Sequence, residues 1–146
     1  MLLQACVATG PAEEPTAQPA APSYVPLANA TAKQRFSEAL TLLARGEPTA
    51  ARAELTLYLD QQPGSRVARD LLRQIDTPAS QYFPPDYEEV TLGSGDSLSS
   101  LSKQYLGSVY KFHALAKYNG ITEPQRIRQG QKIRVPLTDS ARRAFA

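Results

Sequence analysis

The sequence predicts an α+β protein with a disordered N-terminal tether, a small all-α unit of three helices, and a C-terminal βααβ domain with a two-stranded antiparallel sheet. Three observations predict this order. Residues 7–29 are rich in Ala, Pro, Thr and Gln and poor in large apolar residues, as in a semi-rigid tether. Apolar residues then recur at helical spacing over 31–75, and residues 90–136 change between strand and helix periods.

The expected boundaries follow these changes in pattern. We divide the chain into a tether at 1–30, a helical unit at 31–76, a stiff linker at 77–86, the βααβ domain at 87–137 and a C-terminal tail at 138–146. The net charge of +2 is too small to argue for nucleic acid as a partner. No apolar run approaches the ~18 residues of a membrane-spanning helix.

The only cysteine, Cys6, follows Leu2-Leu3-Gln4-Ala5, and a single cysteine allows neither an internal disulfide nor a thiolate metal cluster. This run resembles the lipobox of bacterial lipoproteins, in which the cysteine is lipidated after cleavage. The charged and apolar regions of a complete signal peptide do not precede it, so either the start is truncated or misplaced, or the match is chance. Lipidation at Cys6 implies a membrane anchor in the bacterial cell envelope, facing the periplasm. By family analogy, Val7 at the next position favours the outer membrane.

The helical unit at 31–76 is punctuated by Gly46, by Pro48 and by a predicted helix cap at Ser65. Its small and large residues follow the order of a tetratricopeptide repeat at Ala39, Leu42, Ala51, Leu55 and Pro63. The unit therefore resembles one such repeat, with Arg35 and Glu38 at positions that are usually apolar. Such repeats need about three copies to bury a continuous core. Either the third helix caps the unit or its open face docks on something else, which leaves a spacer bundle and a peptide-binding groove as alternatives.

The C-terminal domain combines two strand patterns with two helical ones. Val90 and Leu92 are expected to face inward from the first strand, and Ile133 and Val135 from the last. A first helix begins at a cap provided by Asp96 or Ser97 and ends at Gly107, and a second helix stops at Asn119-Gly120. The apolar residues that these helices are expected to bury are Leu98, Leu101, Tyr105, Phe112, Leu115 and Ala116.

This order resembles the LysM domain, a small carbohydrate-binding module. Gly95-Asp96-Ser97-Leu98 stands where the family has a Gly-Asp-Thr-Leu turn, and Phe112 stands at its frequent tryptophan position. The departures are Val90 for the usual tyrosine, Ser94 for the usual proline, and a glycine after Asn119. The resemblance implies binding of peptidoglycan or a related N-acetylglucosamine polymer in a shallow groove, with no cofactor.

The groove of the family lies between the loop before the first helix and the loop after the second. Carried over by position, the implied glycan-binding residues are Gly95, Asp96, Ser97, Leu98, Asn119, Gly120, Ile121 and Ile127. Backbone groups exposed by glycine suit an acetamido group, and the apolar side chains suit its methyl. Each neutral hydrogen bond contributes only about 0.5–1.5 kcal/mol, so we expect one module to bind weakly. Asp96 also has a purely structural interpretation as a helix cap.

No catalytic or metal-binding constellation is expected. The only histidine, His113, is predicted at an exposed helix position, and Glu88 and Glu89 point to opposite faces of a strand. The sequence has no serine elbow, zinc pattern or phosphate loop. Two functions from different classes remain. One is a wall-binding lipoprotein that tethers a membrane to peptidoglycan, and the other is a scaffold whose helical unit recruits a partner protein while the LysM module localises it.

Overall fold

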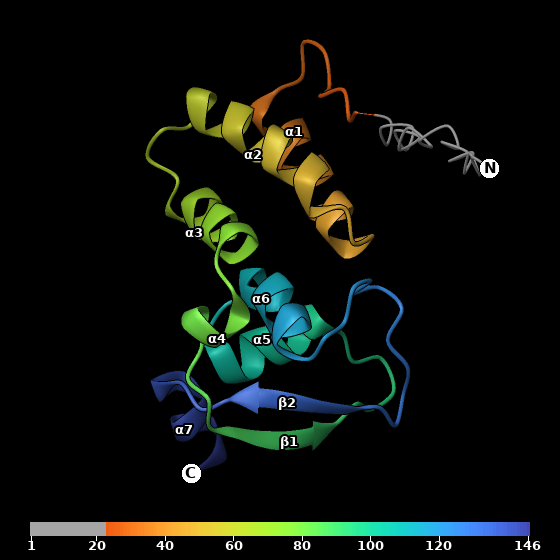
Figure 1. The fold of residues 1–146 in the computed structure, drawn as a ribbon, viewed down its shortest axis with the longest axis vertical. Coiled ribbons are helices and arrows are strands. Elements are labelled where there is room, and N and C mark those ends of the chain that lie inside the picture. The colour runs from red at the N-terminus through yellow and green to blue at the C-terminus, as the bar shows by residue number, and fades with distance from the viewer. Residues whose placement is uncertain (1–22) are drawn as a thin grey trace, which may run out of the picture.

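The computed structural model describes residues 23–146 and confirms the α+β class with a two-stranded antiparallel sheet. Figure 1 shows three levels: the helical unit at one end, the helices of the βααβ domain in the middle, and the sheet at the other end. Cys6 and most of the predicted tether lie outside the described residues. Within 23–146, no helix has both the length and the apolar character needed to cross a bilayer.

The helical unit contains α1 (Ala32–Ala44), α2 (Pro48–Gln61) and α3 (Arg66–Asp76). Its helices begin where the sequence predicts caps. Thr31 and Gln34 form a reciprocal capping box before α1, and the Ser65 hydroxyl accepts a hydrogen bond from the Ala68 amide at 3.1 Å before α3. The core between these helices consists of small and large side chains that are buried in alternation, namely Ala39, Leu42, Ala51, Leu55, Ala68 and Leu71.

A buried ion pair occupies one of the positions where the helical unit departs from an apolar pattern. Glu54 is fully buried, and its Oε2 lies 3.0 Å from Nη1 of Arg35. Its Oε1 accepts hydrogen bonds from the Tyr24 hydroxyl at 2.9 Å and the Leu27 amide at 2.7 Å. Burial and the hydrogen bond to Glu54 raise the pKa of Tyr24 to about 12. Glu54 therefore holds the last residues of the predicted tether, 23–30, against the helical unit.

The linker at 77–86 is packed rather than extended. It contains the short helix α4 (Ala79–Tyr82), followed by the buried ring of Phe83. Phe83 meets Tyr118 of the βααβ domain edge to face, with ring centroids 5.8 Å apart. The Tyr82 hydroxyl bonds the Asp70 carboxylate of α3 at 2.9 Å. The two aromatic residues of the linker thus contact both flanking units.

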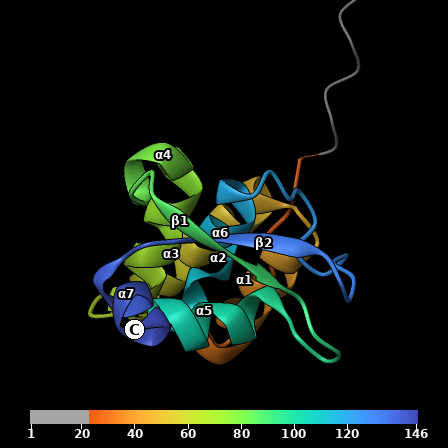
Figure 2. The same ribbon diagram turned by 90° about the horizontal axis from the view of Figure 1, so that it is seen from below.

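The βααβ domain has the element order that the sequence predicts. Strand β1 (Tyr87–Thr91) pairs antiparallel with β2 (Lys132–Pro136), and between them follow α5 (Leu98–Leu106), the 3-10 turn η1 (Val109–Lys111) and α6 (Phe112–Tyr118). Ile133 and Val135 are fully buried and Leu92 nearly so, whereas Val90 is half-buried. Figure 2 shows the strands crossing in front of α5 and α6, so the sheet covers these helices on the side away from the helical unit.

The predicted tail at 138–146 forms helix α7 (Asp139–Phe145). The Thr138 hydroxyl caps it by accepting a hydrogen bond from the Ala141 amide at 3.2 Å. Ala141 is fully buried, and the Phe145 ring stacks on Tyr105 of α5 with centroids 4.6 Å apart. A stretch this short carries barely one turn of apolar periodicity, so only its contact with α5 distinguishes it from a tail.

The helical unit docks on the βααβ domain through the buried side chain of Gln74 in α3. Its Nε2 donates to the Tyr110 carbonyl at 2.7 Å and to the Asp70 carboxylate at 2.8 Å, and its Oε1 accepts from the Ala114 amide at 3.0 Å. Ala114 lies in the first turn of α6, where backbone N–H groups have no partner within the helix. Gln74 therefore satisfies groups of the βααβ domain that are buried by the docking itself.

Lys117 of α6 makes a second set of hydrogen bonds between the two units, in which α6 supplies the side chain and the C-terminal end of α3 supplies the backbone. Its Nζ donates to the carbonyls of Gln74, Ile75 and Thr77 at 2.7, 3.2 and 2.6 Å. A cation is favourable there because the last carbonyls of a helix are unpaired and carry the negative end of its dipole. Burial lowers the pKa of Lys117, and the charge of Asp76 opposes this shift.

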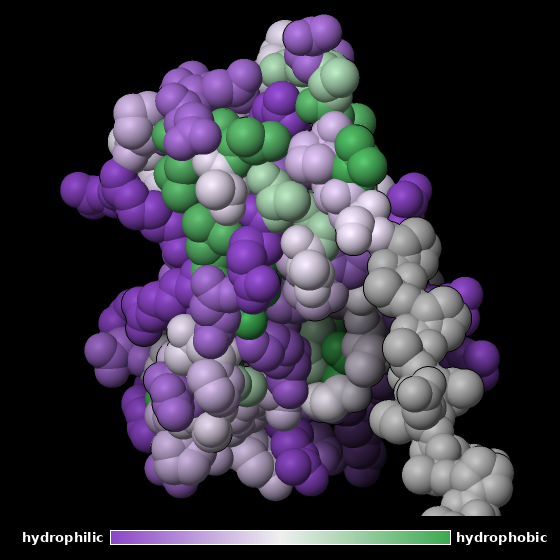
Figure 3. Space-filling model, turned by 45° about the horizontal axis from the view of Figure 1, so that its top comes forward, coloured by the Kyte–Doolittle hydropathy of each residue, from purple (hydrophilic) through white to green (hydrophobic). Residues whose placement is uncertain are grey.

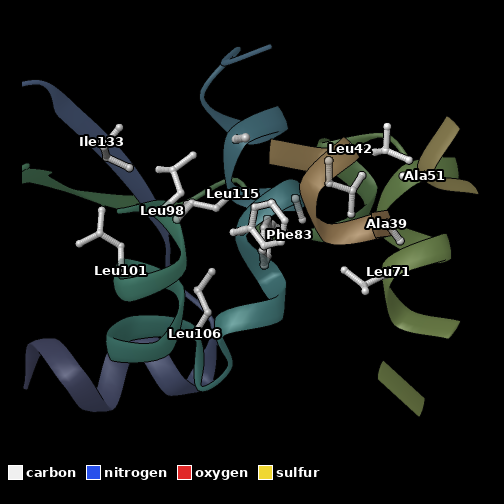
Figure 4. Close-up of a cluster of buried hydrophobic side chains, with 14 of the residues drawn as sticks. Ala39, Leu42, Ala51, Leu71, Phe83, Leu98, Leu101, Leu106, Leu115 and Ile133 are labelled. Atoms are coloured by element: carbon white, nitrogen blue, oxygen red, sulfur yellow. The ribbon is translucent and has the colours of Figure 1, made fainter. Parts of the chain in front are cut away.

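The hydrophobic core continues across the contact between the two units. Figure 4 shows Phe83 and Leu115 lying between apolar side chains of the βααβ domain on one side and those of the helical unit on the other. The labelled residues on the two sides are Leu98, Leu101, Leu106 and Ile133, and Ala39, Leu42, Ala51 and Leu71. The neighbouring domain thus covers part of the apolar surface that a single helical repeat leaves open.

We expect Gln74→Ala to lower the free energy of unfolding by about 2–6 kcal/mol, because two buried backbone groups lose their partners at about 1–3 kcal/mol each. Urea denaturation at pH 7 measures the change. The matched control is Gln104→Ala at an exposed position of α5, which should stay within about 0.5 kcal/mol of the unsubstituted protein. Equal stability of the two variants would contradict the role given to Gln74.

Candidate functional site

The loop before α5 is held by its own side chains and leaves one glycine open. Oδ2 of Asp96 accepts a hydrogen bond from the Gly93 amide at 2.7 Å, and Ser97 caps α5 in a reciprocal box with Ser100. Leu98 is buried in the core. Gly95 has φ +79°, a left-handed conformation that favours glycine, and a Cβ built there would meet nothing within 4 Å. Its backbone is therefore exposed to any ligand that lies across the loop.

The loop after α6 is fastened to the sheet by Asn119. Its Oδ1 accepts from the Arg134 amide at 2.7 Å, and its Nδ2 donates to the Arg134 carbonyl at 2.9 Å. Gly120 is exposed with φ +65°, and nothing lies within 4 Å of a Cβ built there. Ile121 and Ile127 are half-buried. The amide of Asn119 is thus used by the fold, whereas Gly120 leaves its backbone open.

The eight predicted site residues therefore fall into two groups. The side chains of Asp96, Ser97 and Asn119 make hydrogen bonds within the domain, and Leu98 belongs to the core. The groups open to a ligand are the backbone at the two loop glycines and the exposed parts of two isoleucines, that is, Gly95, Gly120, Ile121 and Ile127. Their role in glycan binding remains a prediction.

A cavity of about 330 Å³ lies beside the first loop, and its walls come from both units. The βααβ domain contributes the start of α5, residues 97–99, together with Pro124 and Gln125 of the second loop. Helix α1 contributes Leu40 and Ala44. The remaining wall is formed by Val109, Tyr110 and Phe112.

Sequence reasoning missed the contribution of α1 to this cavity. The side chain of Leu40 is only half-buried, and its exposed part lines this cavity. A signal was present, because Phe36, Leu40 and Ala44 recur every four residues beside the stripe that contains Ala39 and Leu43. Such a wide apolar face exceeds what packing against one neighbouring helix requires.

The second loop is fixed to the turn between α1 and α2. The Gln125 amide donates to the Ala44 carbonyl at 3.1 Å. Gly46, with φ +80°, lies so close to the Thr122 carbonyl that a Cβ at this position would overlap it. The turn therefore needs glycine both for its conformation and for the close approach of the two backbones. The position of the loop is thereby set by the helical unit.

The prediction that His113 is exposed was wrong. His113 is 7% exposed, its Nδ1 has no hydrogen-bond partner, and Phe112 to Ala116 are all buried because α6 packs against α3 on one side and the sheet on another. Burial, with a smaller contribution from Lys117, lowers its pKa to about 4. Among residues 23–146, no group of three or more His, Cys, Asp or Glu side chains could hold a metal ion.

Comparison with known proteins identifies the C-terminal domain. The family model described as "LysM domain" matches residues 90–136. These residues are a LysM domain. LysM domains are binding modules for N-acetylglucosamine-containing glycans such as peptidoglycan, and proteins that contain them are usually associated with the cell wall or envelope.

The chain is also similar to an uncharacterized protein of Deinococcus radiodurans, with 31% identity over 94 residues. The matched region covers 64% of this chain and 33% of the relative, so the chain spans about a third of the relative's length. No solved structure matches the chain.

We expect the buried His113 to make the protein less stable as the pH falls from about 6.5 to about 4. In that range the unfolded chain binds a proton at this histidine and the folded chain does not, so protonation favours unfolding. Between pH 7 and pH 5 the contribution lost is about 2 kcal/mol. Urea denaturation at both pH values gives the change in unfolding free energy for the unsubstituted protein and for His113→Phe. The difference between these two changes is the contribution of His113, since the other groups titrate in both proteins. Parallel stability curves for the two proteins would contradict a neutral buried His113.

Proposed function

We propose that the protein binds peptidoglycan, or a related N-acetylglucosamine polymer, without catalysis. The observation that carries this proposal is the LysM domain at residues 90–136. The two loops that the resemblance assigns to the groove leave the backbones of Gly95 and Gly120 open, and the second loop also carries the partly exposed side chains of Ile121 and Ile127.

The chemistry of these groups suits an N-acetyl sugar. The open amides and carbonyls bond the acetamido group, and the isoleucine side chains contact its methyl and the apolar face of the ring. Each neutral hydrogen bond adds about 0.5–1.5 kcal/mol, so one site gives weak binding. A polymer with many equivalent sites, or a membrane anchor close to the wall, raises the retained fraction through a high effective concentration.

We further propose that the chain is an envelope lipoprotein that tethers a membrane to the wall. The support is the lipobox-like run that ends at Cys6, followed by the Ala- and Pro-rich residues 7–22, which precede the part that Glu54 holds against the helical unit. A spacer of this composition is semi-rigid and extended, which suits a domain that has to reach the wall from a lipid surface. Val7 after the cysteine favours an outer-membrane location facing the periplasm.

The scaffold alternative has less support. A helical unit that recruits a partner protein needs an open face, and α3 of this unit is occupied by the LysM domain. Gln74 and the end of α3 contact α6, and the turn at Gly46 contacts the second loop. The helical unit is better explained as a part that completes and positions the glycan-binding domain.

We expect the protein to sediment with purified peptidoglycan sacculi, and Gly95→Val to reduce the bound fraction about three- to tenfold, equivalent to the loss of about one hydrogen bond or contact. The added side chain projects into the open space over the loop and disfavours its left-handed backbone, while it meets no neighbouring atom in the fold. The control is Gly64→Val, which adds the same side chain at an open glycine between α2 and α3 where φ is not left-handed. A protein that stays in the supernatant contradicts the proposed function, and full retention of Gly95→Val removes this loop from the site.

We expect the full-length gene product, expressed in a diderm bacterium, to incorporate radiolabelled fatty acid and to lose the label entirely in Cys6→Ser. The label is lost because the proposed lipidation takes place at the cysteine, and the sequence has no other cysteine. Fractionation should place the labelled protein with the outer membrane. An unlabelled protein, or equal labelling of the two forms, contradicts the lipoprotein proposal and leaves glycan binding untouched.

A further inference from the structure

The cavity beside the first LysM loop has a wall that the LysM domain does not supply. Leu40 and Ala44 of α1 face it together with Ser97 and Leu98, which belong to the predicted glycan groove. Pro124 and Gln125 of the second loop line it too, so the cavity adjoins both loops of that groove. Its volume of about 330 Å³ lies at the lower end of the range for small-molecule sites.

The apolar surface continues from this cavity along α1. Leu40 and Tyr110 also line a neighbouring surface hollow, whose other walls include Phe36 and Tyr58. The ring centroid of Phe36 lies 5.5 Å from that of Tyr110 and 5.2 Å from that of Tyr58, and all three residues are partly exposed. Figure 3 shows hydrophobic surface among polar side chains over the helical unit. A ligand chain that leaves the LysM groove along α1 thus meets partly exposed aromatic side chains.

We propose that α1 is a third wall of the glycan groove, so that the protein binds a longer N-acetylglucosamine oligomer than the two LysM loops hold alone. This inference rests on the proposed function and extends it to residues outside the LysM domain. Helix α1 then contributes both affinity and a preference for chain length, instead of serving as a spacer.

The chemistry of the cavity fits a neutral N-acetylated sugar. Every side chain that lines it is uncharged, with the hydroxyl of Ser99 and the side-chain amide of Gln125 beside apolar walls. Sugar hydroxyls and acetamido groups bond such polar groups, while the C–H faces of the ring lie on leucine, proline and aromatic surfaces. A few polar groups in a mostly apolar cavity is the usual composition of a specific small-molecule site.

The geometry of this wall is fixed before any ligand binds. The backbone N–H of Gln125 donates to the Ala44 carbonyl at 3.1 Å, and Gly46 lies close to the Thr122 carbonyl. The second loop and the end of α1 are therefore held at one separation. Such preorganisation reduces the entropy lost on binding and makes the contact with α1 available at little cost.

The test is titration calorimetry of the full chain with a trimer and a hexamer of N-acetylglucosamine. We expect the hexamer to bind more tightly, and Leu40→Gln to lower the affinity for the hexamer about tenfold, to that of the trimer, because an apolar contact is lost. Ala44→Leu should have the same effect by filling the cavity, and it keeps the helix apolar and well packed. The matched control is Thr41→Gln, at an exposed position of α1 that does not line the cavity.

The outcomes separate this inference from the proposed function. Equal affinity of the unsubstituted protein for trimer and hexamer overturns the third wall. If Leu40→Gln fails to fold, Ala44→Leu decides the question. Unchanged hexamer binding by Ala44→Leu that thermal unfolding shows to be folded overturns the third wall as well. In either case, if Gly95→Val still lowers binding, the LysM loops remain the glycan site and the proposed function stands. An unsubstituted protein that binds neither oligomer nor sacculi overturns both proposals.

Discussion

The arrangement of the two units depends on the buried side chain of Gln74. It bonds the Ala114 amide and the Tyr110 carbonyl, which belong to the LysM domain, while Lys117 covers the carbonyls at the end of α3. These groups are buried by the docking, so each would remain without a partner if the units met at another angle. The contact is therefore specific as well as favourable, and it brings the end of α1 to the second LysM loop.

Docking also explains how so small a helical unit is stable. One repeat-like pair of helices cannot enclose a core. Here α3 and the LysM helix α6 supply further apolar surface, and the ion pair of Arg35 with Glu54 links α1 to α2. Glu54 binds Tyr24 and Leu27 as well, so the start of the described chain is fixed to the same unit. The helical unit and the LysM domain share one hydrophobic core, and the proposed glycan groove lies at its edge.

The sequence was sufficient for features that short segments determine. The end of α5 at Gly107 and the alternation of Ile133 and Val135 are as predicted, and of the two predicted caps, Asp96 and Ser97, the structure has Ser97. Each of these features depends on neighbouring residues or on one period. The burial of His113 depends on contacts between segments far apart in the chain, which no local pattern encodes. The place of Leu40 in a cavity depends on such contacts too, and the wide apolar face of α1 indicated only that this helix has a further neighbour. Gln74 carried a partial signal, since it lies three residues after Leu71 on the buried face of α3. Sequence reasoning could identify the glycan-binding module, but not that a second unit forms part of its edge.

The most direct test of the shared interface is amide hydrogen exchange, measured by NMR, at Ala114 and Gln125. Both amides donate to acceptors in the helical unit, so their protection reports on the docking itself. If the two units are docked in solution, both amides exchange as slowly as the buried amides of α6 that follow in the same helix. Exchange at the rate of an unstructured peptide, with the rest of α6 protected, would show that the two units separate in solution and would contradict the docked arrangement.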